Sequence, residues 1–152
     1  MDLRELDDGD RPWFCDLIDK AWGLPVVSIS GAHDPSEFPG FVAYEGDARV
    51  GAVTYRFADG ACEVVTLNSV TPGRGIGTAL LAAARTVADQ RRARMWLIST
   101  NDNIRAIEFY QRRGMDIVAL HRNFVDLVRT YKPSLVDATG GIPFRHAIEF
   151  SY

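Results

Sequence analysis

The chain has little cysteine, little histidine and no long apolar run. Its two cysteines, Cys15 and Cys62, are far apart and outside any C-x-x-C pair, which excludes the usual zinc and disulfide frameworks. We expect both to be reduced, buried thiols. The three histidines, His33, His121 and His146, are scattered, so no local metal site is expected.

Features of membrane insertion and export are also missing. No apolar stretch approaches the ~20 residues that cross a bilayer, and the start, MDLRELDDGD, is acidic where a signal peptide is basic. We therefore expect a cytoplasmic protein without a membrane partner. With 47% hydrophobic and 24% charged residues, the composition is typical of a soluble globular protein. The length of 152 residues predicts one domain over 1–152.

The net charge of −3 hides an uneven distribution. Residues 1–68 hold five Lys and Arg against thirteen Asp and Glu, a net −8, whereas residues 69–152 hold twelve against seven, a net +5. Uneven charge steers ligands, which favours an anionic ligand on the second half and a cationic one on the first; an ordinary solvated surface is the alternative. The pI of about 5.6 and the lack of a nucleic-acid motif argue against a nucleic-acid partner.

Local patterns predict a strand and a helix, then three strands with short turns, and then helices that alternate with strands. Glu45-Gly46-Asp47 and Asp59-Gly60 are typical of turns between antiparallel neighbours. This order predicts an α/β (α+β) fold with a mixed, mostly antiparallel central sheet flanked by helices. The expected helices are 11–22, 78–92, 101–113 and 124–131, and the strand segments, turns included, are 2–6, 41–47, 49–60, 61–70, 95–100, 115–120 and 142–152.

Three glycines stand at the start of the first long helix. The stretch VTPGRGIGTALL contains Gly73, Gly75 and Gly77. The first N–H groups of a helix lack partners, and glycine lets a phosphate approach them. A pyrophosphate is therefore the expected ligand, with Arg74 as a charged contact. The G-x-G-x-G spacing departs from the dinucleotide fingerprint, and no Gly-Lys-Ser/Thr follows. A tight turn without a ligand is the remaining alternative.

A second motif lies further along the chain. NIRAIEFYQRRGM, from Asn103 to Met115, together with VTPGRGIGTALL upstream, resembles the GNAT superfamily of acyl-CoA-dependent N-acetyltransferases. The resemblance covers residues 40–120 well, and WLISTNDNIRAIEFYQRRG and GGIPFRHAIEF resemble one bacterial branch. It implies a GNAT-like fold with acetyl-CoA as co-substrate and an amine as acceptor. Two positions depart from the pattern: Pro72 replaces the usual Gln or Arg, and His146 replaces an expected acidic residue.

The resemblance also implies a set of binding residues. The glycine loop and its helix bind the coenzyme A pyrophosphate, and Asn103 bonds the pantetheine arm, with a helix cap as its alternative role. A strand distortion frees a backbone N–H near Leu67 for the thioester carbonyl, and Asn68-Ser69 fits such an irregularity. The full expected set is Leu67, Asn68, Ser69, Gly73, Arg74, Gly75, Ile76, Gly77, Thr78, Asn103 and Ala106.

Two residues are expected to carry the chemistry. Glu63 lies four residues before Leu67, a spacing that puts both side chains on one face of a regular strand. It is the expected base that takes the proton of the attacking ammonium, with an outward-facing surface role as the alternative. Tyr110 is the expected acid for the leaving thiolate, because a phenol (pKa ~10) holds its proton somewhat above a thiol (~8.5). Its alternative is a core role, since Ile104, Ile107 and Tyr110 lie at helical spacing.

The acceptor is predicted from charge alone. The acidic first half favours a cationic amine, such as a polyamine, an aminoglycoside, a lysine or an N-terminus. The family's layout implicates Trp22, the 28–38 loop and the 144–152 end in the acceptor cleft, although a core position is the stronger expectation for Trp22. A non-catalytic acyl-CoA sensor on the same fold is the alternative function, and a homodimer is expected only by analogy.

Overall fold

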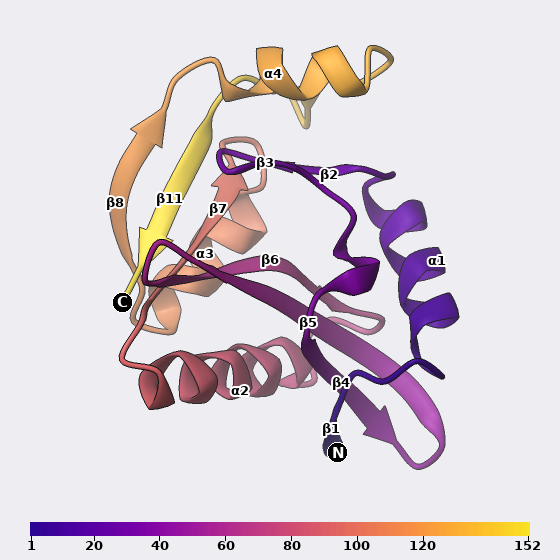
Figure 1. Cartoon of the computed structure of the whole chain (residues 1–152). Helices are drawn as coiled ribbons and strands as arrows, with labels where there is room; N and C mark the ends of the chain where they lie inside the picture. The colour runs from indigo at the N-terminus through magenta and orange to yellow at the C-terminus, as the bar shows by residue number, and fades with distance from the viewer. The chain divides into compact units, whose positions relative to one another are not determined.

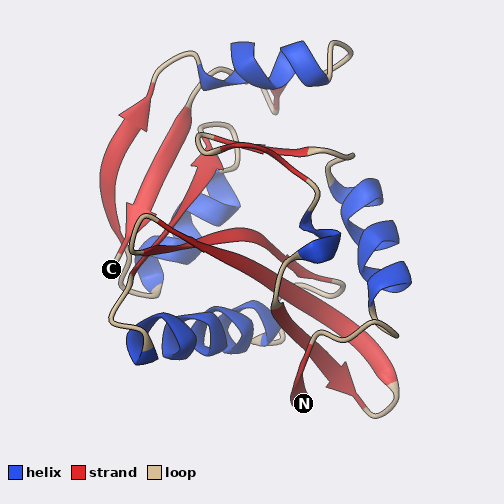
Figure 2. Ribbon diagram, in the orientation of Figure 1, coloured by secondary structure: helices blue, strands red, loops and turns tan.

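The computed structural model describes all residues, 1–152, and divides them into two compact units. The first unit holds residues 1–26 and 32–95, and the second holds residues 27–31 and 96–152. Both contain antiparallel strands and helices, which Figure 1 labels along the chain and Figure 2 shows by type. The expectation of one domain over 1–152 stays a prediction.

The strands of the first unit form an antiparallel meander. They lie in the order β1 (Asp2–Glu5), β4 (Gly40–Glu45), β5 (Ala48–Ala58) and β6 (Ala61–Ser69). Asp59 and Gly60 join β5 to β6 with positive φ angles of 54° and 74°, the conformation that a two-residue hairpin turn needs. The predicted run of three adjacent antiparallel strands is confirmed.

Two helices cover opposite faces of this meander. On one face, α1 (Arg11–Ala21) buries Phe14 and Ile18 against a cluster that includes Ala52 of β5. On the other, α2 (Ile76–Gln90) packs against β4, β5 and β6 (Figure 1). The neighbouring residue of β5, Gly51, makes room for it, because a Cβ there would lie 2.7 Å from Ile76 Cγ2. Replacing Gly51 with a larger residue would therefore force α2 away from the sheet.

The segment between α1 and β4 is irregular. It contains β2 (Val26–Ser28), β3 (Gly31–His33) and the short 3₁₀ helix η1 (Pro35–Glu37). The expected core position of Trp22 is wrong: α1 ends at Ala21, and the Trp22 side chain is 45% exposed just beyond the end of the helix.

The second unit has a three-stranded antiparallel sheet in the order β7 (Arg94–Thr100), β11 (Ala147–Ser151) and β8 (Asp116–His121). Of β7, the residues from Trp96 onward belong to this unit. The last strand of the chain therefore lies between two earlier ones. The helices are α3 (Ile104–Arg112) and α4 (Phe124–Tyr131), and a small hairpin joins β9 (Ala138–Thr139) to β10 (Ile142–Pro143). Phe124, Val125 and Val128 of α4 pack against Ala147.

The predicted strand over 142–152 is interrupted at residues 144–146. The Asn101 side chain accepts hydrogen bonds from Arg145 N at 3.0 Å and His146 N at 2.8 Å, and it donates one to Pro143 O at 2.8 Å. These backbone groups are therefore bonded to a side chain instead of a neighbouring strand, and β11 begins only at Ala147.

Candidate functional site

The backbone of the glycine loop is set by two positive φ angles, +84° at Gly73 and +76° at Gly75. Gly75 is the N-cap of α2, so the helix begins at Ile76, two residues before the predicted start. The first helical hydrogen bond runs from Ala79 N to Gly75 O at 3.1 Å, and no side chain caps the helix. The N–H groups of Ile76 and Gly77 therefore have no carbonyl partner inside the helix.

The space above this loop is open. No heavy atom lies within 4 Å of the point where a Cβ would be at Gly73 or Gly75, and both glycines are exposed. An anion can thus approach the backbone and the positive end of the helix dipole. The residues present therefore fit a phosphate or pyrophosphate group, as the sequence predicts.

Arg74, the charged residue of the glycine loop, is paired with a carboxylate. Arg74 Nη2 lies 3.0 Å from Oε2 of Glu45, the last residue of β4. Its expected phosphate contact stays a prediction. Because exposed ion pairs contribute only about 0–1 kcal/mol, exchanging Glu45 for an anionic ligand costs little.

Strand β6 carries the irregularity that the sequence predicts, but at a different residue. Against β5, Thr66 pairs with Thr54 and Val64 pairs with Tyr55, so Val65 is an extra residue, a β-bulge. Asn68 and Ser69 are paired regularly with Ala52 and Gly51, and the expected irregularity at Asn68-Ser69 is therefore wrong.

The bulge also changes which side chains share a face. Leu67 lies opposite Val53, and Glu63 lies opposite Arg56. Val53 and Arg56 are three residues apart on β5 and point to opposite faces. Glu63 and Leu67 are thus on opposite faces of the sheet, and the expectation of a shared face is wrong because the extra residue reverses the alternation.

Glu63 is a buried, paired carboxylate. It is only 2% exposed, and its Oε1 lies 3.2 Å from Arg56 Nη1. The alternative of an outward-facing surface residue is therefore excluded. Nearby, burial lowers the pKa of His33, an effect that Glu63 opposes and Arg56 reinforces. Glu63 thus shares its surroundings with the Arg56 cation and with the imidazole of His33.

One expected binding residue has an unused polar atom. Asn68 Oδ1 is buried and has no hydrogen-bond partner. In the second unit, Asp102 Oδ1, just before α3, is in the same condition. Buried acceptors without partners are uncommon in folded proteins. Each would be satisfied by a donor on a bound molecule, and a pantetheine arm carries amide N–H groups of that kind.

Tyr110 lies near the end of α3 and has an aromatic environment. Its ring centroid is 5.3 Å from that of Phe109 and 5.4 Å from that of Phe150 in β11. No residue of α3 is fully buried, and Ile104 is 55% exposed. The alternative of a core stripe through Ile104 and Tyr110 is therefore wrong at Ile104. Burial raises the pKa of Tyr110 above that of a free phenol.

This shift predicts a loss of stability at high pH. Because the folded-state pKa of Tyr110 is raised, its contribution to the free energy of unfolding is complete below pH ~10, the unfolded pKa, and declines as pH rises further. We expect Tyr110→Phe to reduce the alkaline loss measured by denaturant titrations between pH 8 and 11. Tyr44 and Tyr55, also with raised pKa values, are present in both proteins. Identical pH profiles for wild type and variant would contradict the prediction.

Asn103 caps α3. Its Oδ1 accepts a hydrogen bond from Ala106 N at 3.1 Å, and the helix accordingly begins at Ile104 instead of Asn101. The helix-cap alternative is confirmed. The cap does not involve the Asn103 amide nitrogen, so a contact with a pantetheine arm stays a prediction, as does the role of Ala106.

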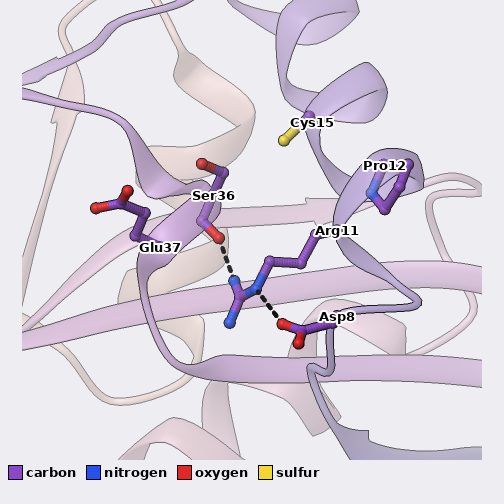
Figure 3. Close-up of a pocket in the computed structure, with 6 residues that line it drawn as sticks. All are labelled: Asp8, Arg11, Pro12, Cys15, Ser36 and Glu37. Carbon is purple, nitrogen blue, oxygen red and sulfur yellow. Dashed lines mark hydrogen bonds and ion pairs between the residues drawn. The ribbon is translucent and has the colours of Figure 1, made fainter.

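A pocket of about 720 Å³ opens between α1 and η1 (Figure 3). Arg11 crosses it: its Nη1 donates to Ser36 O and, at 3.1 Å, to Phe38 O, while its Nε lies 3.7 Å from Asp8 Oδ1. The predicted acceptor region includes the 36–37 part of this pocket, whereas Arg11 and Asp8 were not predicted. The lining residues are Asp8, Arg11, Pro12, Cys15, Ser36 and Glu37.

Neither a membrane helix nor a metal cluster is found. None of the helices is both long and apolar enough to cross a membrane. No group of three or more His, Cys, Asp or Glu side chains is arranged to hold a metal ion.

Comparison with known proteins establishes the class. The Acetyltransferase (GNAT) family matches residues 4–115, and the chain belongs to this family. It is 39% identical over 140 residues to the uncharacterized protein YdhI of Bacillus subtilis, covering 90% of this chain and 88% of that protein.

Solved structures confirm the fold. A GNAT family acetyltransferase from Elizabethkingia anophelis, solved with acetyl-CoA bound, matches with a TM-score of 0.73 at 14% identity, over 99% of this chain and 95% of that one. A Bacillus subtilis acetyltransferase in complex with CoA gives 0.70 at 17% identity, over 99% and 97%. The predicted α/β fold, with a mixed, mostly antiparallel sheet and flanking helices, is therefore confirmed.

Proposed function

We propose that this protein is an N-acetyltransferase that moves an acetyl group from acetyl-CoA to a primary amine by direct attack. The observation that carries the proposal is the N-terminus of α2, where Gly73 and Gly75 hold uncapped N–H groups open to an anion. Family membership supports acetyl-CoA as the source of that anion. Ile76, Gly77 and Thr78 would bind the pyrophosphate through their backbone, with Arg74 turning from Glu45 as a charged contact.

Attack on the thioester also requires contacts to the pantetheine arm, an oxyanion donor and an acid for the leaving thiolate. Asn68, Ser69, Asn103 and Ala106 are the proposed contacts of the pantetheine arm, and the backbone N–H of Leu67 would stabilise the oxyanion. One preorganised donor of this kind contributes about 3 kcal/mol to the transition state. Tyr110 would protonate the leaving thiolate.

Glu63 is the proposed proton acceptor for the ammonium form of the amine. Its carboxylate is buried beside Arg56, which fixes the position of the side chain. A cationic acceptor is supported by the net −8 of residues 1–68. At the pocket beside α1, two carboxylates, Asp8 and Glu37, outnumber one cation, Arg11, which favours the same preference.

The test is a screen of acceptor amines with wild type and Glu63→Gln. Thiol release from acetyl-CoA would be measured with polyamines, aminoglycosides, lysine derivatives and peptides. We expect turnover with at least one cationic amine, and a loss of about 10²- to 10⁴-fold in Glu63→Gln, the usual size of a general-base contribution. Glu108→Gln, which loses only an exposed ion pair with Arg112, is the control and should keep wild-type activity.

Two outcomes would count against the proposal. A substrate set restricted to neutral or anionic amines would contradict the cationic acceptor. Binding of coenzyme A without turnover of any amine would favour the alternative, a non-catalytic acyl-CoA sensor.

A further inference from the structure

One half-buried arginine of the first unit has unused hydrogen-bond donors. Arg56 of β5 has a side chain that is 27% exposed, and its Nη1 donates to Oε1 of Glu63 on β6 at 3.2 Å. A guanidinium carries five N–H groups in a planar fork, and this ion pair is the one polar contact of Arg56. Nε and Nη2 therefore remain as donors for a bound molecule.

An arginine near the other end of β5 shows how the same side chain serves a structural purpose. Arg49 donates from Nε to Asp10 at 2.7 Å and from Nη2 to Gly9 O at 3.3 Å. It thereby joins β5 to the segment that leads into α1. Arg56 contacts only Glu63, the residue directly opposite it in the register of β5 and β6. The fold therefore gives Nε and Nη2 of Arg56 no structural use.

The ion pair shares a face of the sheet with a proposed contact of acetyl-CoA. Asn68, which has a buried oxygen without a partner, lies opposite Ala52. Ala52 and Arg56 are four residues apart on β5, so their side chains point to one face. Asn68, Arg56 and Glu63 thus lie on the same face of the meander.

The ion pair also acts on the segment that is expected to line the acceptor cleft. Glu63 raises the pKa of His33 and Arg56 lowers it, so both charges are felt at this ring. His33 in turn packs edge-on against Phe38, with ring centroids 5.6 Å apart. Both rings belong to the 28–38 segment that the family's layout implicates in acceptor binding.

An α-amino acid complements this pair of charges. Its ammonium and carboxylate groups are attached to one carbon atom, so a carboxylate lies within reach of Arg56 when the ammonium faces Glu63. Two N–H groups of a guanidinium match the two oxygens of a carboxylate in geometry. A simple diamine carries only hydrogen at the corresponding position and would leave the donors of Arg56 unused.

We propose that Arg56 binds the carboxylate of the acceptor, and that the acceptor is a free cationic α-amino acid acetylated on its α-nitrogen. The inference rests on the proposed function, in which Glu63 takes a proton from that nitrogen. As the C–N bond forms and the C–S bond breaks, the ammonium nitrogen loses two protons. Sulfur gains one of them as the free thiol, and the other passes through Glu63 to water. Arg56 acts by holding the α-nitrogen against Glu63.

The experiment compares amines that differ only in the carboxylate. The pairs are L-lysine with 1,5-diaminopentane, L-ornithine with 1,4-diaminobutane, and L-arginine with agmatine. Rates would be measured by thiol release from acetyl-CoA, and the acetylated nitrogen of each product would be identified by NMR. We expect kcat/KM of the wild-type protein to be at least about tenfold higher for the amino acid of at least one pair, because charge-assisted hydrogen bonds are strong. The acetyl group should be on the α-nitrogen.

Two variants of Arg56 test its part in this preference. Arg56→Gln removes the guanidinium and leaves Glu63 without its cation, so rates should fall with both members of a pair and the preference for the amino acid should be lost. Arg56→Lys keeps a positive charge beside Glu63 but lacks the planar fork, and it should retain only part of the preference. Lys20→Gln, which removes a cation of the same unit from an exposed pair with Asp16, is the control and should keep the wild-type preference.

The outcomes separate this inference from the proposed function. A wild-type protein that acetylates amines without preferring the amino acids, or that modifies them on a side-chain nitrogen, would overturn the inference and leave the proposed function intact. A wild-type preference that persists in both Arg56 variants would do the same. The comparison of amines with the wild-type protein decides the matter even if Arg56→Gln does not fold. No turnover of any amine by wild type would remove both proposals.

Discussion

Replacing Tyr110 with Phe is expected to lower kcat by about 10²- to 10⁴-fold, the range of a general acid, while acetyl-CoA binding stays unchanged. The substitution removes only the hydroxyl group and keeps the ring that contacts Phe109 and Phe150. The melting temperature should therefore be close to that of wild type. Rates would be measured by thiol release and binding by calorimetry.

The raised pKa of Tyr110 adds a second readout. Because the phenol keeps its proton beyond pH ~10, its ionisation should not limit kcat/KM below that pH. Tyr131→Phe, which alters a half-exposed tyrosine of α4, is the control and should be fully active. A Tyr110→Phe variant with more than half of the wild-type kcat would show that the thiolate leaves without this acid.

Replacing Gly75 with Ala is expected to lower acetyl-CoA affinity at least tenfold. At φ +76° an alanine Cβ is strained, at a cost of about 1–2 kcal/mol. The methyl group would also occupy the open space above the N-terminus of α2, where the pyrophosphate is proposed to bind. The two effects are separable, because strain lowers stability whereas the methyl group lowers affinity.

Gly60→Ala is the matched control for Gly75→Ala. Gly60 has φ +74° in the β5–β6 turn and likewise no atom within 4 Å of its Cβ position. Both variants should lose a similar amount of unfolding free energy in urea titrations, and only Gly75→Ala should lose affinity. Equal affinity of the two variants for acetyl-CoA would argue against the loop as the pyrophosphate site.

The elements predicted correctly are those with strong local signals. Asp59-Gly60 predicts a tight turn because both residues tolerate positive φ angles, and the three-strand meander follows from it. The helix over 124–131 was predicted with the bounds that α4 has. The starts of α2 and α3 were displaced by two and three residues, because a glycine and an asparagine cap occupy the boundary.

The errors come from pairings between distant segments. Nothing in ACEVVTLNS marks Val65 as an extra residue, since a bulge exists only relative to the partner strand, here β5. Counting by twos from Leu67 to Glu63 therefore gave the wrong face. The start of the predicted last strand was wrong for a similar reason: Asn101, more than forty residues earlier, binds the backbone of Arg145 and His146.

The candidate site was predicted in part. The glycine loop and the capping alternative for Asn103 could be derived locally, because helix N-termini have known preferences. The partners of charged groups could not be derived locally, because the pairing of Arg74 with Glu45 depends on the register of the meander and on the conformation of the loop. Contacts between distant strands could not be derived either: His121 and Glu149, 28 residues apart in the chain, lie with Nε2 and Oε1 3.0 Å apart. Only the insertion of β11 beside β8 brings them together.

The most direct test of the central claim is a thermal shift of the wild-type protein with acetyl-CoA, coenzyme A and NAD. A ligand that binds the folded state stabilises it by about 2.7 kcal/mol at one hundred times its Kd. We predict a clear rise in Tm with both coenzyme A ligands and none with NAD. No rise with saturating acetyl-CoA or coenzyme A would contradict the account, leaving the glycine loop as a turn without a ligand.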